Sequence, residues 1–187
     1  MNILIIDTTT KDLIVAAVSN GKVTDGTVLN NGTHHLERLC DCVDSTLHKA
    51  GLVLKDLDCI ACAVGPGSFT GIRIGISAVK GYQCALDIPV VEINVLNAMQ
   101  FGKNVSGAVI DAGNGYYYGK YDGFDCIVSP CLIAYDDERV KGCQTMENCY
   151  LLEAEVAIAL HKAQTGQFAD KLTPVYIRKS QAEELRK

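Results

Sequence analysis

The order of strand and helix patterns constrains the fold of this chain more than any other feature. Three short apolar runs predict strands, at residues 2–7, 12–19 and 22–30. Asn20-Gly21 lies between the last two runs and favours a tight hairpin. From there on, predicted helices alternate with strands: helix 34–50, strand 58–64, helix 69–85, strand 88–93 and helix 95–101. This order predicts an α/β protein with a mixed sheet and helices on its faces.

The pattern of strands restarts after residue 105. Further strands are predicted at 107–113, 115–122 and 124–135, followed by a helix at 151–163 and a closing helix at about 178–187. Both halves open with an apolar strand that ends in an aspartate, Asp7 in the first and Asp111 in the second. We therefore predict two similar domains, residues 1–105 and a reduced domain at 106–177. The closing helix would be free to pack back on the first domain.

The charge of the chain argues against direct binding of nucleic acid. It carries 22 acidic and 17 basic residues, for a formal net charge of −5, and 48% of its residues are hydrophobic. A protein that grips RNA through phosphates needs a basic surface, so a role on RNA would depend on a more basic partner. The first residues, MNILIIDTTTKD, have no basic leader and only a short apolar run. We expect neither a signal peptide nor a membrane anchor, and a cytoplasmic location.

The nine cysteines are interpreted as reduced residues of the fold, without disulfides or bound metal. Cys59 and Cys62 lie in a predicted strand, where a separation of three residues points the side chains to opposite faces. No second pair at metal-ligand spacing accompanies them. A zinc site is therefore not expected.

The glycine-rich stretch GPGSFTGIRIG, at residues 65–75, first suggests a phosphate loop between a strand and a helix. A P-loop needs lysine where this chain has Ile72, and the dinucleotide fingerprint needs a third glycine where it has Thr70. Both phosphate motifs therefore fail.

Helix packing is a second explanation for these glycines. Gly71 and Gly75 are one helical turn apart, and Gly81 continues a face of small residues. Each glycine inside a helix costs roughly 1 kcal/mol relative to alanine, so close approach by another segment must compensate. That segment is either a partner helix or the chain's own sheet.

Several strings together resemble one known family. Duplicated βββαβαβα halves are the layout of the actin-like ATPases, and the chain resembles the TsaB family within that group. The strings that carry the resemblance are MNILIIDTTT, HHLERL, VGPGSFTGIRIG, IPVVEI, VIDAGNGYYYGKY and TPVYIRKSQAE. The resemblance implies a two-domain actin-like (ASKHA, ribonuclease H-like) fold. It also implies work alongside TsaD and TsaE in making threonylcarbamoyladenosine on tRNA.

The resemblance implies no catalytic residue, cofactor or metal in this chain, because TsaB is the non-catalytic paralogue of TsaD. The metal ligands of TsaD include an HxxxH pair on the first helix, whereas this chain has adjacent histidines, His34 and His35. Neighbouring residues point about 100° apart on a helix, so these two cannot readily face one metal. No GxSxG motif is present, and protease activity is not expected.

Two loops resemble weak remnants of the phosphate loops of the ATPases. The candidate residues are Asp7, Thr8, Thr9, Asp111 and Gly113. In the second loop Tyr116 stands where the ATPases have threonine. A vestigial loop is the favoured interpretation, and nucleotide binding is the alternative.

The family also implies that the first two helices form the interface with TsaD. The expected interface residues are Leu36, Leu39, Cys40, Val43, Phe69, Gly71, Ile72, Arg73, Gly75 and Val79. Arg73 and Glu37 are candidates for ion pairs across that boundary. The alternative is that the apolar residues form ordinary core stripes.

The sequence thus leads to one expected function and one alternative. The expected function is a non-catalytic partner and activator of TsaD in threonylcarbamoyl transfer to the adenosine next to the tRNA anticodon. The expected partners are a TsaD-type protein in a heterodimer, a TsaE-type ATPase in a larger complex, or a second copy of the chain. The contact with tRNA would be indirect. The alternative is an independent ATP-binding enzyme of the actin-like and sugar-kinase superfamily.

Overall fold

A five-stranded mixed sheet forms the centre of the molecule. The computed structural model describes residues 1–29, 34–147 and 149–177. The strands are β1 (Asn2–Asp7), β2 (Leu13–Ser19), β3 (Lys22–Leu29), β4 (Cys59–Gly65) and β5 (Val90–Asn94), in the order β3-β2-β1-β4-β5. β1, β4 and β5 are parallel to one another, while β2 and β3 run antiparallel to their neighbours. The predicted mixed sheet is confirmed.

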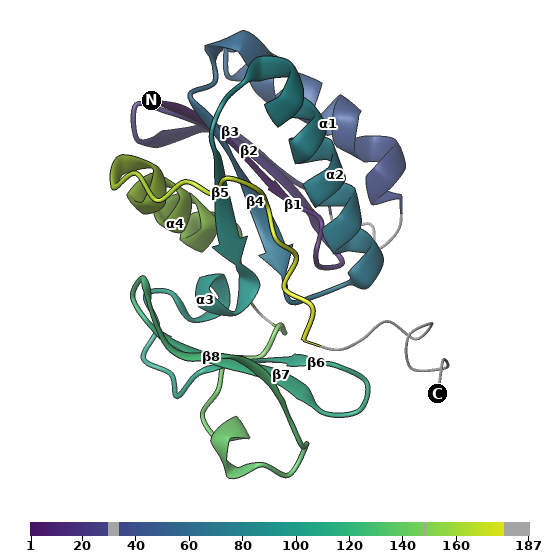
Figure 1. Cartoon of the computed structure of the whole chain (residues 1–187), viewed down its shortest axis with the longest axis vertical. Helices are drawn as coiled ribbons and strands as arrows, with labels where there is room; N and C mark the ends of the chain where they lie inside the picture. Colours follow the sequence, from purple (N-terminus) through teal and green to yellow (C-terminus); the bar gives the residue numbers. More distant parts are fainter. Residues whose placement is uncertain (30–33, 148, 178–187) are drawn as a thin grey trace.

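Helices cover both faces of this sheet (Figure 1). α1 (His35–Lys49) and α2 (Phe69–Leu86) lie side by side on one face, and α3 (Val95–Gln100) and α4 (Leu152–Gln164) pack on the other. Single turns of 3-10 helix occur at Leu54–Asp56 and Glu138–Val140. Thr33, a candidate cap for α1, and the predicted closing helix lie outside the described residues.

The alternation of strand side chains divides the core into two layers. Ile3 and Ile5 of β1 pack towards α3 and α4, while Leu4 and Ile6 pack towards α1 and α2. All four are completely buried, because β1 is the central strand and is covered on both faces. Cys59 and Cys62 lie in opposite layers, as their spacing predicted.

A second, three-stranded antiparallel sheet lies beyond α3 (Figure 1). Its strands are β6 (Ala108–Asp111), β7 (Tyr116–Asp122) and β8 (Asp125–Ile133). The buried Gln100 at the end of α3 joins helix and sheet, because its Oε1 accepts from Tyr121 N–H at 3.0 Å. α4 follows the predicted domain boundary in sequence but packs on the first sheet. The division into domains at residue 105 therefore stays a prediction. α4 covers a face of the first sheet although it follows that boundary in sequence.

The last described segment, residues 169–177, returns along the edge of the five-stranded sheet, and we call it the strap (yellow in Figure 1). Thr173 N–H donates to Glu92 Oε1 at 2.5 Å, and Val175 N–H donates to the carbonyl of Val64 at 2.8 Å. The strap thereby covers β5 and reaches the start of α2. None of the described helices is long and apolar enough to cross a membrane.

Candidate functional site

The loop after β1 and the glycine-rich turn before α2 pack directly on each other. Thr8 Oγ1 donates to the carbonyl of Gly71 at 2.7 Å, and Ser68 N–H donates to the carbonyl of Thr9 at 2.7 Å. A Cβ on Gly71 would overlap the Thr8 carbonyl oxygen, and one on Gly75 would lie 2.6 Å from Thr8 Oγ1. These glycines are needed for a contact within the chain. The segment that approaches them is therefore the chain's own β1–β2 loop and not a partner helix.

This packing bears on the expected interface with TsaD, which stays a prediction. Six of the ten expected residues are buried inside the chain: Leu39, Val43, Gly71, Ile72, Gly75 and Val79. Leu36, by contrast, is 71% exposed, and Cys40 is exposed beside it on α1. The buried residues hold α1 and α2 on their own sheet, so they form a core and not a free surface.

Arg73 and Glu37 have partners within the chain. The Arg73 guanidinium lies 3.8 Å from the centroid of the Phe69 ring, and its Nε donates to Tyr176 Oη at 3.2 Å. Glu37 is 3.2 Å from the ring of His34. Within the chain, Arg73 thus joins α2 to the strap and Glu37 pairs with the residue before α1, while ion pairs across a boundary stay a prediction.

The outward surface of α1 and α2 presents a face that contains small residues. Its residues differ from most of those expected at the interface. We define the outer helix face as Leu36, Cys40, Ile74, Ser77, Ala78 and Gly81. Ser77 and Gly81 are exposed and one turn apart, and a Cβ on Gly81 would meet nothing within 4 Å. Unlike Gly71 and Gly75, Gly81 therefore has no packing explanation within the described chain.

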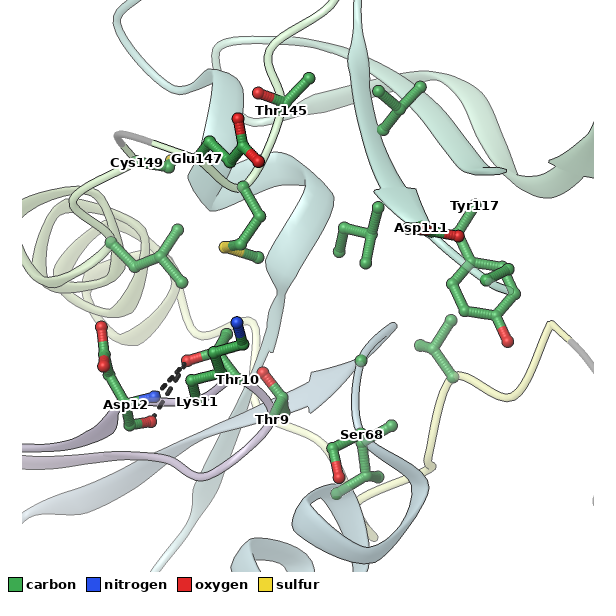
Figure 2. Close-up of a pocket in the computed structure, with 18 of the residues that line it drawn as sticks. Thr9, Thr10, Lys11, Asp12, Ser68, Asp111, Tyr117, Thr145, Glu147 and Cys149 are labelled. Atoms are coloured by element: carbon green, nitrogen blue, oxygen red, sulfur yellow. Dashed lines mark hydrogen bonds between the residues drawn. The ribbon is translucent and has the colours of Figure 1, made fainter. Parts of the chain in front are cut away.

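A cleft of about 1550 Å³ lies between the two sheets (Figure 2). It is lined by the β1–β2 loop, the turn before α2, the β6–β7 loop, the segment before α4 and the strap. Thr9 and Asp111, from the two loops that resemble phosphate loops, both line it. Lys11 and Ser68 add a cationic side chain and a hydroxyl to the same walls (Figure 2). The polar lining could receive a charged small molecule.

The loop aspartates differ sharply in their environments. Asp111 is exposed, and its Oδ1 accepts from Gly113 N–H at 2.7 Å and from Tyr135 Oη at 2.9 Å. These hydrogen bonds hold the pKa of Asp111 below its usual value. Asp7 is completely buried and does not line the cleft.

Glu155 on α4 is the residue of this region that sequence reasoning missed. Its carboxyl group is completely buried beside Asp7. A single glutamate in an amphipathic helix gives no sequence signal of burial, since most helical glutamates are solvated.

The histidines at the start of α1 do not converge. His35 Nε2 lies 3.0 Å from the carbonyl oxygen of Thr10, while His34 pairs with Glu37. Among residues 1–29, 34–147 and 149–177, no three His, Cys, Asp or Glu side chains are grouped as metal ligands would be.

Comparison with known proteins places this geometry in a family. The family model described as "TsaD: tRNA N6-adenosine threonylcarbamoyltransferase" matches residues 30–141. The "tRNA threonylcarbamoyladenosine biosynthesis protein TsaB" of Haemophilus influenzae is 36% identical over 127 residues, which are 64% of this chain and 53% of that protein. TsaB of Escherichia coli is 36% identical over 128 residues, 65% of this chain and 55% of that protein. The chain belongs to the TsaD family, in its TsaB/YeaZ branch.

A solved structure of a TsaB/YeaZ protein shares the fold. "YeaZ from Pseudomonas aeruginosa" superposes with a TM-score of 0.79 at 23% identity, covering 94% of this chain and 99% of that one. The chain therefore shares the fold of YeaZ, an α/β fold as predicted. The aligned part of the chain spans about half the length of the curated TsaB relatives it matches.

Proposed function

We propose that this TsaB/YeaZ-family chain is the non-catalytic partner and activator of a TsaD-type protein in threonylcarbamoyl transfer to tRNA, at the adenosine next to the anticodon. Its curated relatives carry the name of threonylcarbamoyladenosine biosynthesis proteins. The observation that carries the proposal is the outer helix face, and Gly81 above all.

Gly81 supports a partner because nothing else in the described chain requires it. An exposed glycine inside a helix destabilises that helix by about 1 kcal/mol relative to alanine. Ser77 lies one turn before Gly81, so the backbone of α2 is open to close approach along this turn. Leu36, 71% exposed on the neighbouring helix, adds an apolar contact beside this opening. A helix of a TsaD-type protein would fill such a face, and a second copy of this chain is the competing occupant.

The remaining parts of the proposal follow from charge and family. The net charge of −5 fits a subunit that meets tRNA only through a more basic partner. A TsaE-type ATPase would join the larger complex, and the complex would act in the cytoplasm. Asp7, buried away from the cleft, fits a chain that carries no catalytic step of its own.

The test is complex formation between the purified chain and its cognate TsaD-type protein, followed by size-exclusion chromatography with light scattering. We expect a complex with the wild-type chain and at least a tenfold loss of affinity with Gly81→Arg. The matched control is Gln164→Arg, which adds the same side chain at an exposed position of α4, on the opposite face of the sheet. Unchanged affinity of a folded Gly81→Arg chain would remove the outer helix face from the proposal.

The cleft favours one second candidate, an independent ATP-binding enzyme. Its volume of about 1550 Å³ and the polar side chains among its apolar walls could accept a nucleotide. This candidate predicts that the isolated chain binds ATP in calorimetry and hydrolyses it without TsaD. Absence of both would leave the partner function alone.

A further inference from the structure

Two acidic side chains meet in the core where α4 packs under β1. Asp7 ends β1 and Glu155 lies in the first turn of α4, and both are 0% exposed. Asp7 Oδ1 accepts from Thr9 N–H at 2.6 Å. Asp7 Oδ2 and both carboxyl oxygens of Glu155 accept from no N–H or O–H donor of the described residues.

The surroundings of this pair supply little positive charge. The titratable groups that interact with it are Cys62 of β4, Cys149 before α4 and His35 of α1, and Glu92 of β5 acts in turn on Cys62. His35 alone among these can become a cation, and its ring nitrogen lies against the carbonyl oxygen of Thr10. Lys162, a basic residue of α4, donates to the carbonyl of Glu92 at 2.9 Å.

Two ionised carboxylates cannot remain together in this environment without a large cost, because burial removes both groups from bulk solvent and their like charges repel each other. Burial raises the pKa of both groups. The charge of Asp7 raises the pKa of Glu155 further, whereas hydrogen bonds to Asp7 act in the opposite direction on its own pKa. The single proton of the pair therefore belongs on Glu155.

We propose that Glu155 keeps its proton at neutral pH and donates it to Asp7, so that a shared proton fastens α4 to the end of β1. The proton accounts for Asp7 Oδ2, which accepts it, and for the one Glu155 oxygen that carries it. It also places a pH-sensitive contact directly beneath the loop that packs on Gly71.

The direction of the pH effect follows from proton uptake on folding. Glu155 has an ordinary pKa in the unfolded chain and a raised one in the folded chain, so folding binds a proton between these two values. The contact is fully present below the unfolded pKa and is lost as pH rises through the folded one. Stability therefore decreases with rising pH across that window.

The experiment compares urea unfolding of the wild-type chain, Glu155→Gln and Glu153→Gln from about pH 5 to about pH 8.5. Glutamine keeps an N–H donor towards Asp7 but has no proton to lose. We expect the wild-type chain to take up about one more proton on folding than Glu155→Gln does, which appears as a steeper loss of stability with pH. Glu153 is exposed on the same turn of α4, so Glu153→Gln should follow the wild-type slope.

Parallel pH curves for the wild-type chain and Glu155→Gln would overturn the proposal. If Glu155→Gln does not fold, isotope-edited infrared spectroscopy of glutamate carboxyl groups in the wild-type chain decides instead. A protonated carboxyl band at neutral pH supports the shared proton, and its absence contradicts it. A rise in the wild-type unfolding midpoint on adding Mg²⁺, absent in Glu155→Gln, would assign the pair to a cation and also overturn it.

Discussion

At the scale of single residues, three glycines in one helix serve different purposes. Gly71 and Gly75 permit the β1–β2 loop to rest against the backbone of α2, where the Thr8 hydroxyl is held. Gly81 faces open space. The same residue type is therefore a requirement of the fold at two positions and is exposed, with space around it, at the third.

We predict that Gly71→Ala destabilises the chain by about 1–3 kcal/mol or more, because its Cβ would collide with the Thr8 carbonyl oxygen. Gly81→Ala should instead stabilise the isolated chain by roughly 0.5–1 kcal/mol through helix propensity. Urea unfolding measures both. Equal effects of the two substitutions would contradict the assigned difference.

At the scale of elements, α1 shows that an apolar stripe read from the sequence can be only partly buried. The sequence suggested Leu36, Leu39, Cys40, Val43 and Leu47 as one stripe. The structure buries Leu39, Val43 and Leu47 together with Cys42 and Thr46, and it turns Leu36 and Cys40 outwards. Both stripes have helical spacing, and only the position of the sheet selects between them.

We predict that Leu39→Ala, at a site 2% exposed, costs about 2–5 kcal/mol of unfolding free energy. Leu36→Ala removes the same atoms from a solvated position and should change stability by no more than about 0.5 kcal/mol. Chemical denaturation of the two variants side by side provides the measurement. A large loss in Leu36→Ala would show that this side chain is covered in solution.

The strands and helices were predictable from sequence because local patterns determine them. Apolar runs located β1 and β4, and Asn20-Gly21 located the hairpin, where both residues have the positive φ that such a turn requires. The burial of Glu155 and the contact of Gly71 with Thr8 were not predictable, because each depends on segments far apart in the chain. The sequence therefore predicted which loops and helices form the candidate site. Only the structure shows which of their side chains face outwards.

At the scale of the whole molecule, the two sheets are joined through α3 and through an aromatic contact. The ring of Phe124, in the β7–β8 hairpin, stacks on His161 of α4 with centroids 3.6 Å apart. The ring centroid of Phe101, which follows α3, lies 5.1 Å from the ring centroid of Phe124. The far end of the second sheet is therefore held against the helices of the first.

We predict that Phe124→Ala loosens the second sheet and leaves the first intact, because the lost contact lies between them. Hydrogen exchange of the β7 and β8 amides should become at least several-fold faster, while the amides of β1 and β4 keep their protection. Uniform acceleration across both sheets would mean that they open as one unit.

The strap has a consequence for how the protein is made. The edge of the five-stranded sheet next to β5 is covered by residues 169–177, and the layer under β1 is supplied by α4. A chain emerging from the ribosome therefore exposes β1 to β5 well before the segments that cover them have been synthesised. The amino-terminal sheet can be completed only after nearly all of the described chain has been translated.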